Sequence, residues 1–234
     1  MTAVQTARQR ARRELEHVIK ATAGRHLAES GAAALSLRAV AREMGMASSA
    51  LYRYYPSRDA LLTALIVDAY DAIGETAEEA ADPALAAGAR WLAVCRSVRG
   101  WALVHPHEWA LVYGSPVPGY AAPADTVEPA TRLSRVMAAV VLGAAEDGTL
   151  GVPARPLPGP RLVTDVVLEM AGGPPAPPYD DVLERSVVLL VALVGAVSYE
   201  LFGHSYSAFT DDAAWFDVAM AVAAEGVGLD LPLG

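Results

Sequence analysis

Residues 36–62, SLRAVAREMGMASSALYRYYPSRDALL, contain several side chains that can hydrogen-bond to the edges of bases. Arg38 carries a guanidinium group that can donate two hydrogen bonds to one guanine. Ser48, Ser49 and Tyr52 follow, and their hydroxyl groups can both donate and accept hydrogen bonds. These residue types suit the reading of a nucleic-acid duplex in its major groove, provided that short helices present them outward.

The local sequence predicts those helices. Ser36 can cap a first helix, and Gly45 stands where that helix needs a left-handed stop. A second short helix fits residues 47–54, and Leu51 can pack back on the first while the hydroxyl residues face outward. Pro56 ends the second helix, and a third begins at residue 57. Two short helices around a tight glycine turn form a helix-turn-helix pattern. Spacing alone also permits a helix pair that binds nothing.

Together with the helix expected before it, this stretch resembles the N-terminal DNA-binding domain of the TetR family of transcriptional repressors. The resemblance covers roughly residues 8–65 and includes the family pattern LYxxFxxKxxLL, matched by Leu51, Tyr52, Tyr55, Arg58, Leu61 and Leu62. Tyr55 replaces the usual Phe, and Arg58 replaces the common Lys while keeping its charge. The rest of the chain resembles the family's C-terminal domain only in being helical and apolar.

The resemblance implies a set of DNA-binding residues. Arg38 is expected on base edges, whereas Ser36, Tyr54 and Arg58 match positions that hold the DNA backbone. For Arg58 the alternative is a solvated residue at a helix start. The whole expected set is Ser36, Arg38, Ala47, Ser48, Ser49, Tyr52, Tyr54 and Arg58.

The charge distribution favours this interpretation although the net charge of the chain is −9. Residues 1–60 contain ten cationic and five acidic side chains, for a net charge of +5, which leaves −14 for the remainder. A basic head on an acidic body fits a phosphate-binding domain joined to a domain that does not touch DNA. The arginines of the first helix are either contacts to the DNA backbone or part of a solvated face.

The chain is predicted to be all-α and to have two domains. The DNA-binding domain spans residues 1–56, with a first helix at about 10–30 and the helix-turn-helix at about 36–55. The ligand-binding and dimerisation domain spans 57–234 and begins with a connecting helix at 57–80. Further helices are expected at about 82–104, 105–113, 125–147, 160–171, 179–203 and 211–226, between loops rich in Pro and Gly.

The helix at 179–203 and the last helix are apolar on more than one side and must be buried. In the TetR family two such helices form a four-helix interface with a second subunit, whereas the alternative is that both belong to the core of a monomer. The expected dimer seam consists of Val187, Leu190, Val194, Val197, Trp215, Val218 and Val222.

Aromatic side chains around the helix break at Pro106 indicate a ligand cavity or, equally, ordinary core. The candidate ligand-binding residues are Trp101, His105, His107, Trp109 and Tyr113, with Asp165 and Glu169 as further polar candidates. Such a lining favours a largely apolar ligand.

Nothing in the sequence forms a catalytic or metal-binding pattern. His105 and His107 are spaced poorly for zinc, and no nucleotide-binding loop or nucleophile motif occurs. Cys95 is the single cysteine and is interpreted as a buried apolar residue, and the alternative is a reactive thiol. No enzyme activity, metal or cofactor is expected.

The sequence therefore predicts a cytoplasmic, homodimeric regulator that binds a palindromic double-stranded DNA operator and is released by a small, largely apolar effector. The alternative is an all-α ligand-binding protein or enzyme that does not bind DNA. No membrane span is expected, because the most apolar run, 187–197, has about 11 residues and is too short. Seventeen Arg against one Lys are typical of a GC-rich bacterial genome. The operator, the effector and the regulated genes, and whether regulation is repression or activation, are not encoded in these patterns.

Overall fold

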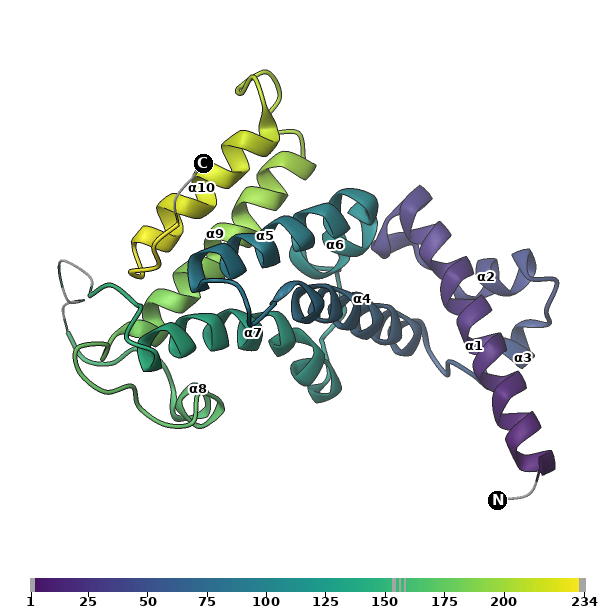
Figure 1. Ribbon diagram of the computed structural model, residues 1–234. Coiled ribbons are helices and arrows are strands. Elements are labelled where there is room, and N and C mark those ends of the chain that lie inside the picture. Colours follow the sequence, from purple (N-terminus) through teal and green to yellow (C-terminus); the bar gives the residue numbers. More distant parts are fainter. Residues whose placement is uncertain (1–2, 153–154, 156, 158, 232–234) are drawn as a thin grey trace. The chain divides into compact units, whose positions relative to one another are not determined.

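The computed structural model describes residues 3–152, 155, 157 and 159–231 and is all-α over those residues, as predicted. Figure 1 shows the helices in chain order. Their bounds are α1 Ala3–Ser30, η1 Ala32–Ala34, α2 Leu37–Glu43, α3 Ser48–Leu51, α4 Arg58–Ala80, α5 Ala87–Val104, α6 Pro106–Tyr113, η2 Ala124–Thr126, α7 Val127–Glu146, α8 Asp165–Met170, α9 Val182–Leu201 and α10 Asp212–Glu225.

Contacts between residues divide the chain into two compact units. The first unit comprises Met1–Tyr70 and His105–Val127, and the second comprises Asp71–Val104 and Glu128–Gly234. The division falls inside α4, and α6 belongs with the N-terminal helices. The functional boundary at residue 57 stays a prediction, because compactness does not say which segment binds which partner.

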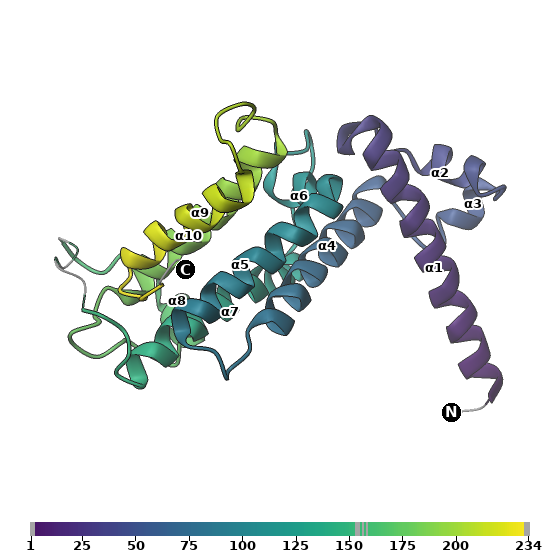
Figure 2. The same cartoon turned by 45° about the horizontal axis from the view of Figure 1, so that its top comes forward.

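In the first unit, α1 lies across α2 and α3 and supplies much of the core (Figure 2). Ile19 and Ala23 of α1 are fully buried, together with Val40 of α2 and Leu51 of α3. An ion pair between Lys20 and the Asp68 carboxylate also joins α1 to α4. These contacts fix the orientation of the two short helices, which are too short to be stable alone.

The turn between α2 and α3 has the geometry that the sequence predicts. Ser36 caps α2, since its hydroxyl accepts a hydrogen bond from the Ala39 N–H at 3.4 Å. At the other end Gly45 has a φ of 65°, in the left-handed region that favours glycine. The Met46 N–H donates to the Ala41 carbonyl at 2.8 Å and the Gly45 N–H to the Arg42 carbonyl at 3.1 Å, the pattern of a Schellman stop.

Several helix bounds differ from the prediction for local reasons. Helix α3 ends at Leu51 and not at residue 54, because the Arg53 and Tyr54 N–H groups bond only three residues back, to Ala50 and Leu51. Helix α1 begins at Ala3, so residues 3–9 are helical.

In the second unit α5 begins at Ala87 and not near residue 82. Residues 82–86 make a turn whose carbonyl oxygens, those of Asp82, Pro83 and Leu85, accept hydrogen bonds from the Arg90 guanidinium. Helix α8 covers only residues 165–170 of the expected 160–171.

The core of the second unit is built by α5, α9 and α10, which pack on one another. The indole N–H of Trp91 donates to the Met220 carbonyl at 3.1 Å, and Arg99 makes two hydrogen bonds to the Glu200 carboxylate. Cys95 lies in this core with 0% exposure, and burial raises the pKa of its thiol well above the usual value. The interpretation of Cys95 as a buried apolar residue is confirmed.

Helix α9 has an apolar surface that the second unit does not cover. Val187, Val188 and Val191 are 48%, 58% and 65% exposed. Val197, by contrast, is 0% exposed inside the protomer, so its place in the expected dimer seam was wrong: its side chain cannot reach a second subunit. Leu190, Val194 and Trp215 are half-buried, and Val218 and Val222 on α10 are 48% and 65% exposed.

By length and composition alone, α9 could cross a membrane, since the helix extends beyond the 187–197 run. One such helix is weak evidence for a span, because core helices of soluble proteins pass the same test. Helix α9 also contains Arg185 and Glu200, and both make ion pairs within the second unit.

Candidate nucleic-acid interface

The outer surface of α2 and α3 carries the side chains expected to read bases. Arg38 in the first turn of α2 is exposed, and Ala47 and Ser49 at the start of α3 are exposed as well. Tyr52, directly after α3, is 42% exposed, whereas Ser48 is half-buried. Leu51 is fully buried behind them and holds α3 against the core. Burial of that one side chain turns the hydroxyl groups of α3 toward solvent, where a partner can reach them.

An ion-pair cluster ties α1 to the last turn of α2. The Arg25 guanidinium donates to one oxygen of the Glu43 carboxylate at 2.7 Å, and His26 Nε2 lies 2.6 Å from the other. Hydrogen bonds from Arg25 and His26 hold the pKa of Glu43 below its usual value. Glu43 is the only acidic residue of α2, and its charge is paired in this cluster. The other charged residues of α2, Arg38 and Arg42, are exposed.

The three residues expected on the DNA backbone have protein partners of their own. The Ser36 hydroxyl caps α2. Tyr54 is half-buried, and the Arg12 guanidinium lies 5.3 Å from the centre of its ring. Arg58 donates hydrogen bonds to the carbonyl oxygens of Ala32 at 2.9 Å and Ala33 at 3.4 Å. Arg58 therefore holds the η1 turn to the start of α4, a structural role that the sequence alone does not reveal.

Two exposed arginines next to this surface were not among the predicted contacts. Arg42 lies in the last turn of α2, and Arg53 directly follows Tyr52. The signal for Arg53 was present in the sequence, since a cation beside the outward-facing Tyr52, directly after α3, is suited to bind phosphate.

The candidate ligand residues are distributed over both units. Trp109 is fully buried, its ring centroid lies 4.5 Å from that of Tyr113, and Tyr70 meets Tyr113 edge to face at 6.0 Å. Burial raises the pKa of the Tyr113 hydroxyl. Trp101 belongs to the second unit and the other four residues to the first.

The two histidines of this group differ in their surroundings. His105 Nδ1 lies 3.7 Å from a Glu108 carboxylate oxygen. His107 is exposed and lines a cavity of about 460 Å³ in the first unit, together with Leu27 and Val117. Among the residues that the structure describes, no three metal-binding side chains come together.

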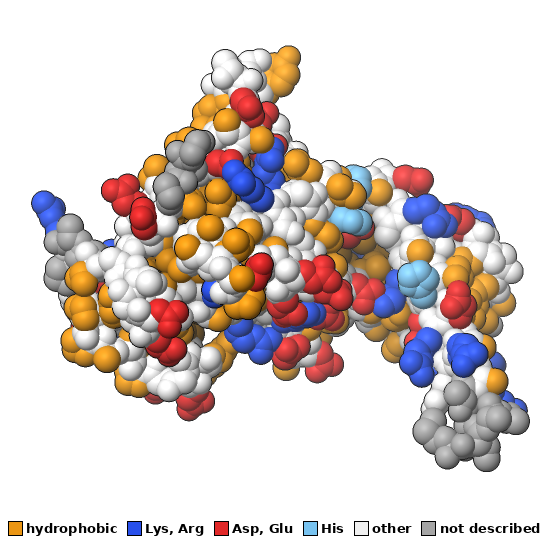
Figure 3. All heavy atoms as spheres, in the orientation of Figure 1, with side chains coloured by type: hydrophobic (Ala, Val, Ile, Leu, Met, Phe, Trp, Pro, Cys, Tyr) orange, Lys and Arg blue, Asp and Glu red, His pale blue; other side chains and the backbone are white. Residues whose placement is uncertain are grey.

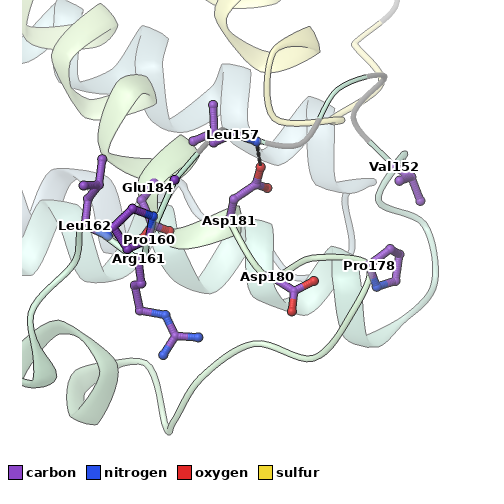
Figure 4. Close-up of a pocket in the computed structure, with 10 residues that line it drawn as sticks. Val152, Leu157, Pro160, Arg161, Leu162, Pro178, Asp180, Asp181 and Glu184 are labelled. Carbon is purple, nitrogen blue, oxygen red and sulfur yellow. Dashed lines mark hydrogen bonds between the residues drawn. The ribbon is translucent and has the colours of Figure 1, made fainter.

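The second unit contains two further hollows. One, of about 400 Å³, lies between α7, α8 and α9 and has an apolar lining that includes Ala138, Leu142 and Met170, with Arg135 as its charged group. The other, of about 470 Å³, is more polar and is lined by Arg161, Asp180, Asp181 and Glu184 (Figure 4). There the Asp181 carboxylate accepts a hydrogen bond from the Leu157 N–H at 2.7 Å. Asp165 and Glu169, the further polar candidates, are exposed on α8.

Comparison with known proteins identifies the family to which this chain belongs. Residues 19–65 match the family model described as bacterial regulatory proteins of the tetR family. Residues 91–223 match the tetracyclin repressor-like C-terminal domain. The HTH-type transcriptional regulator Rv1816 of Mycobacterium tuberculosis is 40% identical over 216 residues, which cover 90% of this chain and 91% of that protein. The chain belongs to the TetR family of transcriptional regulators.

Solved structures agree with that assignment. The crystal structure of the regulatory protein SCO4313 superposes with a TM-score of 0.73 at 29% identity, covering 93% of this chain and 98% of the other. A tetR-family regulatory protein from Rhodococcus RHA1 superposes with a TM-score of 0.62 at 15% identity, over 92% and 97% of the two chains, and shows the shared fold. The expected family and the expected DNA-binding regulator are thus confirmed, and the chain is a regulator rather than an enzyme.

As a TetR regulator the chain is expected to read bases through Arg38. Replacing Arg38 with Ala should weaken binding to the operator by about 1–3 kcal/mol and relax the base preference at one position, because a bidentate contact to guanine is lost. Fluorescence anisotropy with operator and random-sequence duplexes measures both effects. An equal loss on the two duplexes would mean that Arg38 touches only phosphate.

Arg58 could either hold the η1 turn in place or bind DNA phosphate, and replacing it with Ala distinguishes the two roles. If the guanidinium mainly holds η1, Arg58→Ala should lower the free energy of unfolding by about 1–2 kcal/mol, since two charge-assisted hydrogen bonds are lost. If it mainly binds phosphate, stability should stay near wild type and the salt dependence of DNA binding should flatten by about one unit. We expect the first result, from chemical denaturation without DNA. Unchanged stability together with a flatter salt slope would contradict it.

Proposed function

We propose that the chain is a homodimeric repressor that binds a palindromic operator and leaves it when a small, largely apolar ligand binds. DNA binding by the TetR family is the established part, and the dimer, the operator symmetry, repression and release are inferred. Exposed valines on α9 and α10 are the observation that carries the proposal. A cytoplasmic location follows from the same role, since the operator is on the chromosome.

The stripe on α9 has the spacing of one helix face. Val187, Val188, Val191, Gly195 and Tyr199 recur at steps of one, three or four residues, and all are exposed. Apart from the backbone of α9 itself and the two neighbours of Gly195 in the chain, no atom lies within 4 Å of the position where a side chain at Gly195 would begin, so another helix can approach closely there. The seam predicted from sequence ran through Val187, Leu190, Val194 and Val197 on this helix. The exposed face shares Val187 with that seam and is otherwise rotated from it by about one residue.

Helix α10 extends the apolar face. It packs on α9, and Val218 and Val222 are exposed on it at a four-residue spacing. Exposed apolar side chains on two helices that pack together are unfavourable in water and are typical of an interface. A second copy of the chain is the occupant that we propose, because helix-turn-helix domains that read palindromes work in pairs.

The apolar hollow between α7, α8 and α9 supports ligand release. Its volume of about 400 Å³ fits a small organic molecule, and most of its lining is apolar. Arg135, Ser134 and Thr131 on α7 offer polar contacts along its wall. The aromatic cluster around Trp109 stays the second candidate, although the complete burial of Trp109 also suits ordinary core.

The dimer is tested at a residue that the protomer itself leaves exposed. Val191→Glu should leave the monomer folded, because Val191 is 65% exposed, but should bury an unpaired charge in the dimer. The dimer dissociation constant should rise by about a hundred-fold or more, a loss of several kcal/mol. Sedimentation equilibrium measures the constant, and circular dichroism checks the fold.

Val166→Glu is the matched control, since Val166 is 64% exposed on α8 and lies outside the stripe. It should leave assembly unchanged. A Val191→Glu protein that remains dimeric and binds operator like wild type would place the interface elsewhere.

The ligand site is tested by filling the hollow. Ala138→Trp should occupy the space between α7 and α9 and abolish saturable binding of anilinonaphthalene sulfonate, a planar apolar dye, while operator affinity stays near wild type. Dye fluorescence and anisotropy with operator DNA are the two measurements. Dye binding equal to wild type in the Trp variant would exclude this hollow and leave the Trp109 cluster.

A further inference from the structure

We propose that the N-terminal part of α1 is a second DNA contact, in which Arg8 and Arg12 bind phosphates of the duplex beside the helix-turn-helix. The proposal rests on the DNA-binding function and adds a contact site outside the helix-turn-helix. The match to the tetR-family model begins at residue 19, so neither arginine lies within it.

The segment from Ala7 to Glu14 is helical, and each of its residues is exposed. Buried residues of α1 begin only at Ile19, after the half-buried Leu15 and Glu16. In both views α1 continues past α3 toward the N-terminus (Figures 1 and 2). Blue side chains mark the described part of this segment in Figure 3. Four of the eight residues from Ala7 to Glu14 are arginines, and Glu14 is the only acid.

Helical phase separates these arginines into two pairs. Arg12 and Arg8 stand seven and eleven positions before Ile19, close to two and three whole turns. They therefore continue the face of α1 that packs on α2 and α3. Arg10 stands nine positions before Ile19 and points the opposite way, and Arg13 stands six positions before it and points to the side.

Contacts of Arg12 confirm that this face adjoins the recognition surface. Its guanidinium lies 5.3 Å from the ring centre of Tyr54, two residues after the exposed Tyr52. Burial raises the pKa of the neighbouring Tyr55 to about 12, and the Arg12 charge is near enough to oppose that rise. A duplex that contacts Tyr52 and Arg53 is thus within reach of a cation stacked on Tyr54.

Electrostatics within the free protein explain only part of this pattern. Arg8 and Arg12 are like charges four residues apart, which repel on a helix, and no acidic residue occupies the first turn of α1. The ion pair of Arg12 with Glu16, at 2.8 Å, offsets part of this cost, but its arginine is 59% exposed. A polyanion laid along the face would neutralise both arginines.

The test compares two charge-matched double variants. Arg8→Ala with Arg12→Ala removes the inner pair, and Arg10→Ala with Arg13→Ala removes the same charge from the outer faces. Each is titrated by fluorescence anisotropy with a labelled random-sequence duplex of about 30 base pairs, long enough to include flanking phosphates, over a series of salt concentrations. Alanine favours helix, and circular dichroism confirms that α1 is retained.

We expect the inner pair to flatten the slope of log K against log salt by about two units for each bound subunit, and the outer pair to leave it near wild type. A variant with Lys at both positions 8 and 12 should keep the wild-type slope, because phosphate binding needs the charge. Equal slopes for the inner and outer pairs would overturn the proposal. Absence of duplex binding by the wild-type protein itself would instead overturn the DNA-binding function.

Discussion

Burial of Leu51 is the constraint on which the recognition surface depends. Helix α3 has four residues, and a helix of that length has no stability of its own in water. Leu51 anchors it in the core made by α1, α2 and α4, where Ile19, Val40 and Leu61 are also fully buried. Because Leu51 points inward, Ser49 and Tyr52 point outward. Changes to that core therefore act on DNA binding without touching DNA.

Charge complements this packing. The Glu43 cluster uses the acid at the end of α2, so the surface around α3 keeps its exposed arginines. Arg58 shows that a cation in a basic domain can have a structural role instead, since it donates hydrogen bonds to protein carbonyl groups. Net charge marks the DNA-binding half of such a chain, but only contacts show which cations remain available to phosphate.

Local signals in the sequence predicted the first unit well. The cap at Ser36, the left-handed turn at Gly45 and the inward side chain at Leu51 depend on neighbours only a few residues away. The family motif added the expectation of a DNA-binding role, which the comparisons confirmed.

The second unit was harder to predict, for two physical reasons. When a helix is apolar nearly all round, its sequence does not indicate which side is buried. Val197 could therefore not be distinguished from Val191 by sequence, and the structure separates them because α10 and α5 cover one side of α9. The start of α5 could not be predicted from adjacent residues either. The Arg90 guanidinium donates hydrogen bonds to carbonyl groups five to eight residues before it and so stabilises a turn there. Pockets depend on such long-range packing, and the aromatic cluster around Trp109 was therefore a hypothesis from composition alone.

We propose that a symmetric protein dimer presents two copies of α3 to one duplex. Footprinting of the purified protein on the DNA upstream of its own gene tests it most directly. The proposed dimer should protect two half-sites related by a two-fold axis, with centres about 34–36 Å apart or a multiple of that distance. A single protected half-site at saturating protein, or no protection at all, would contradict it.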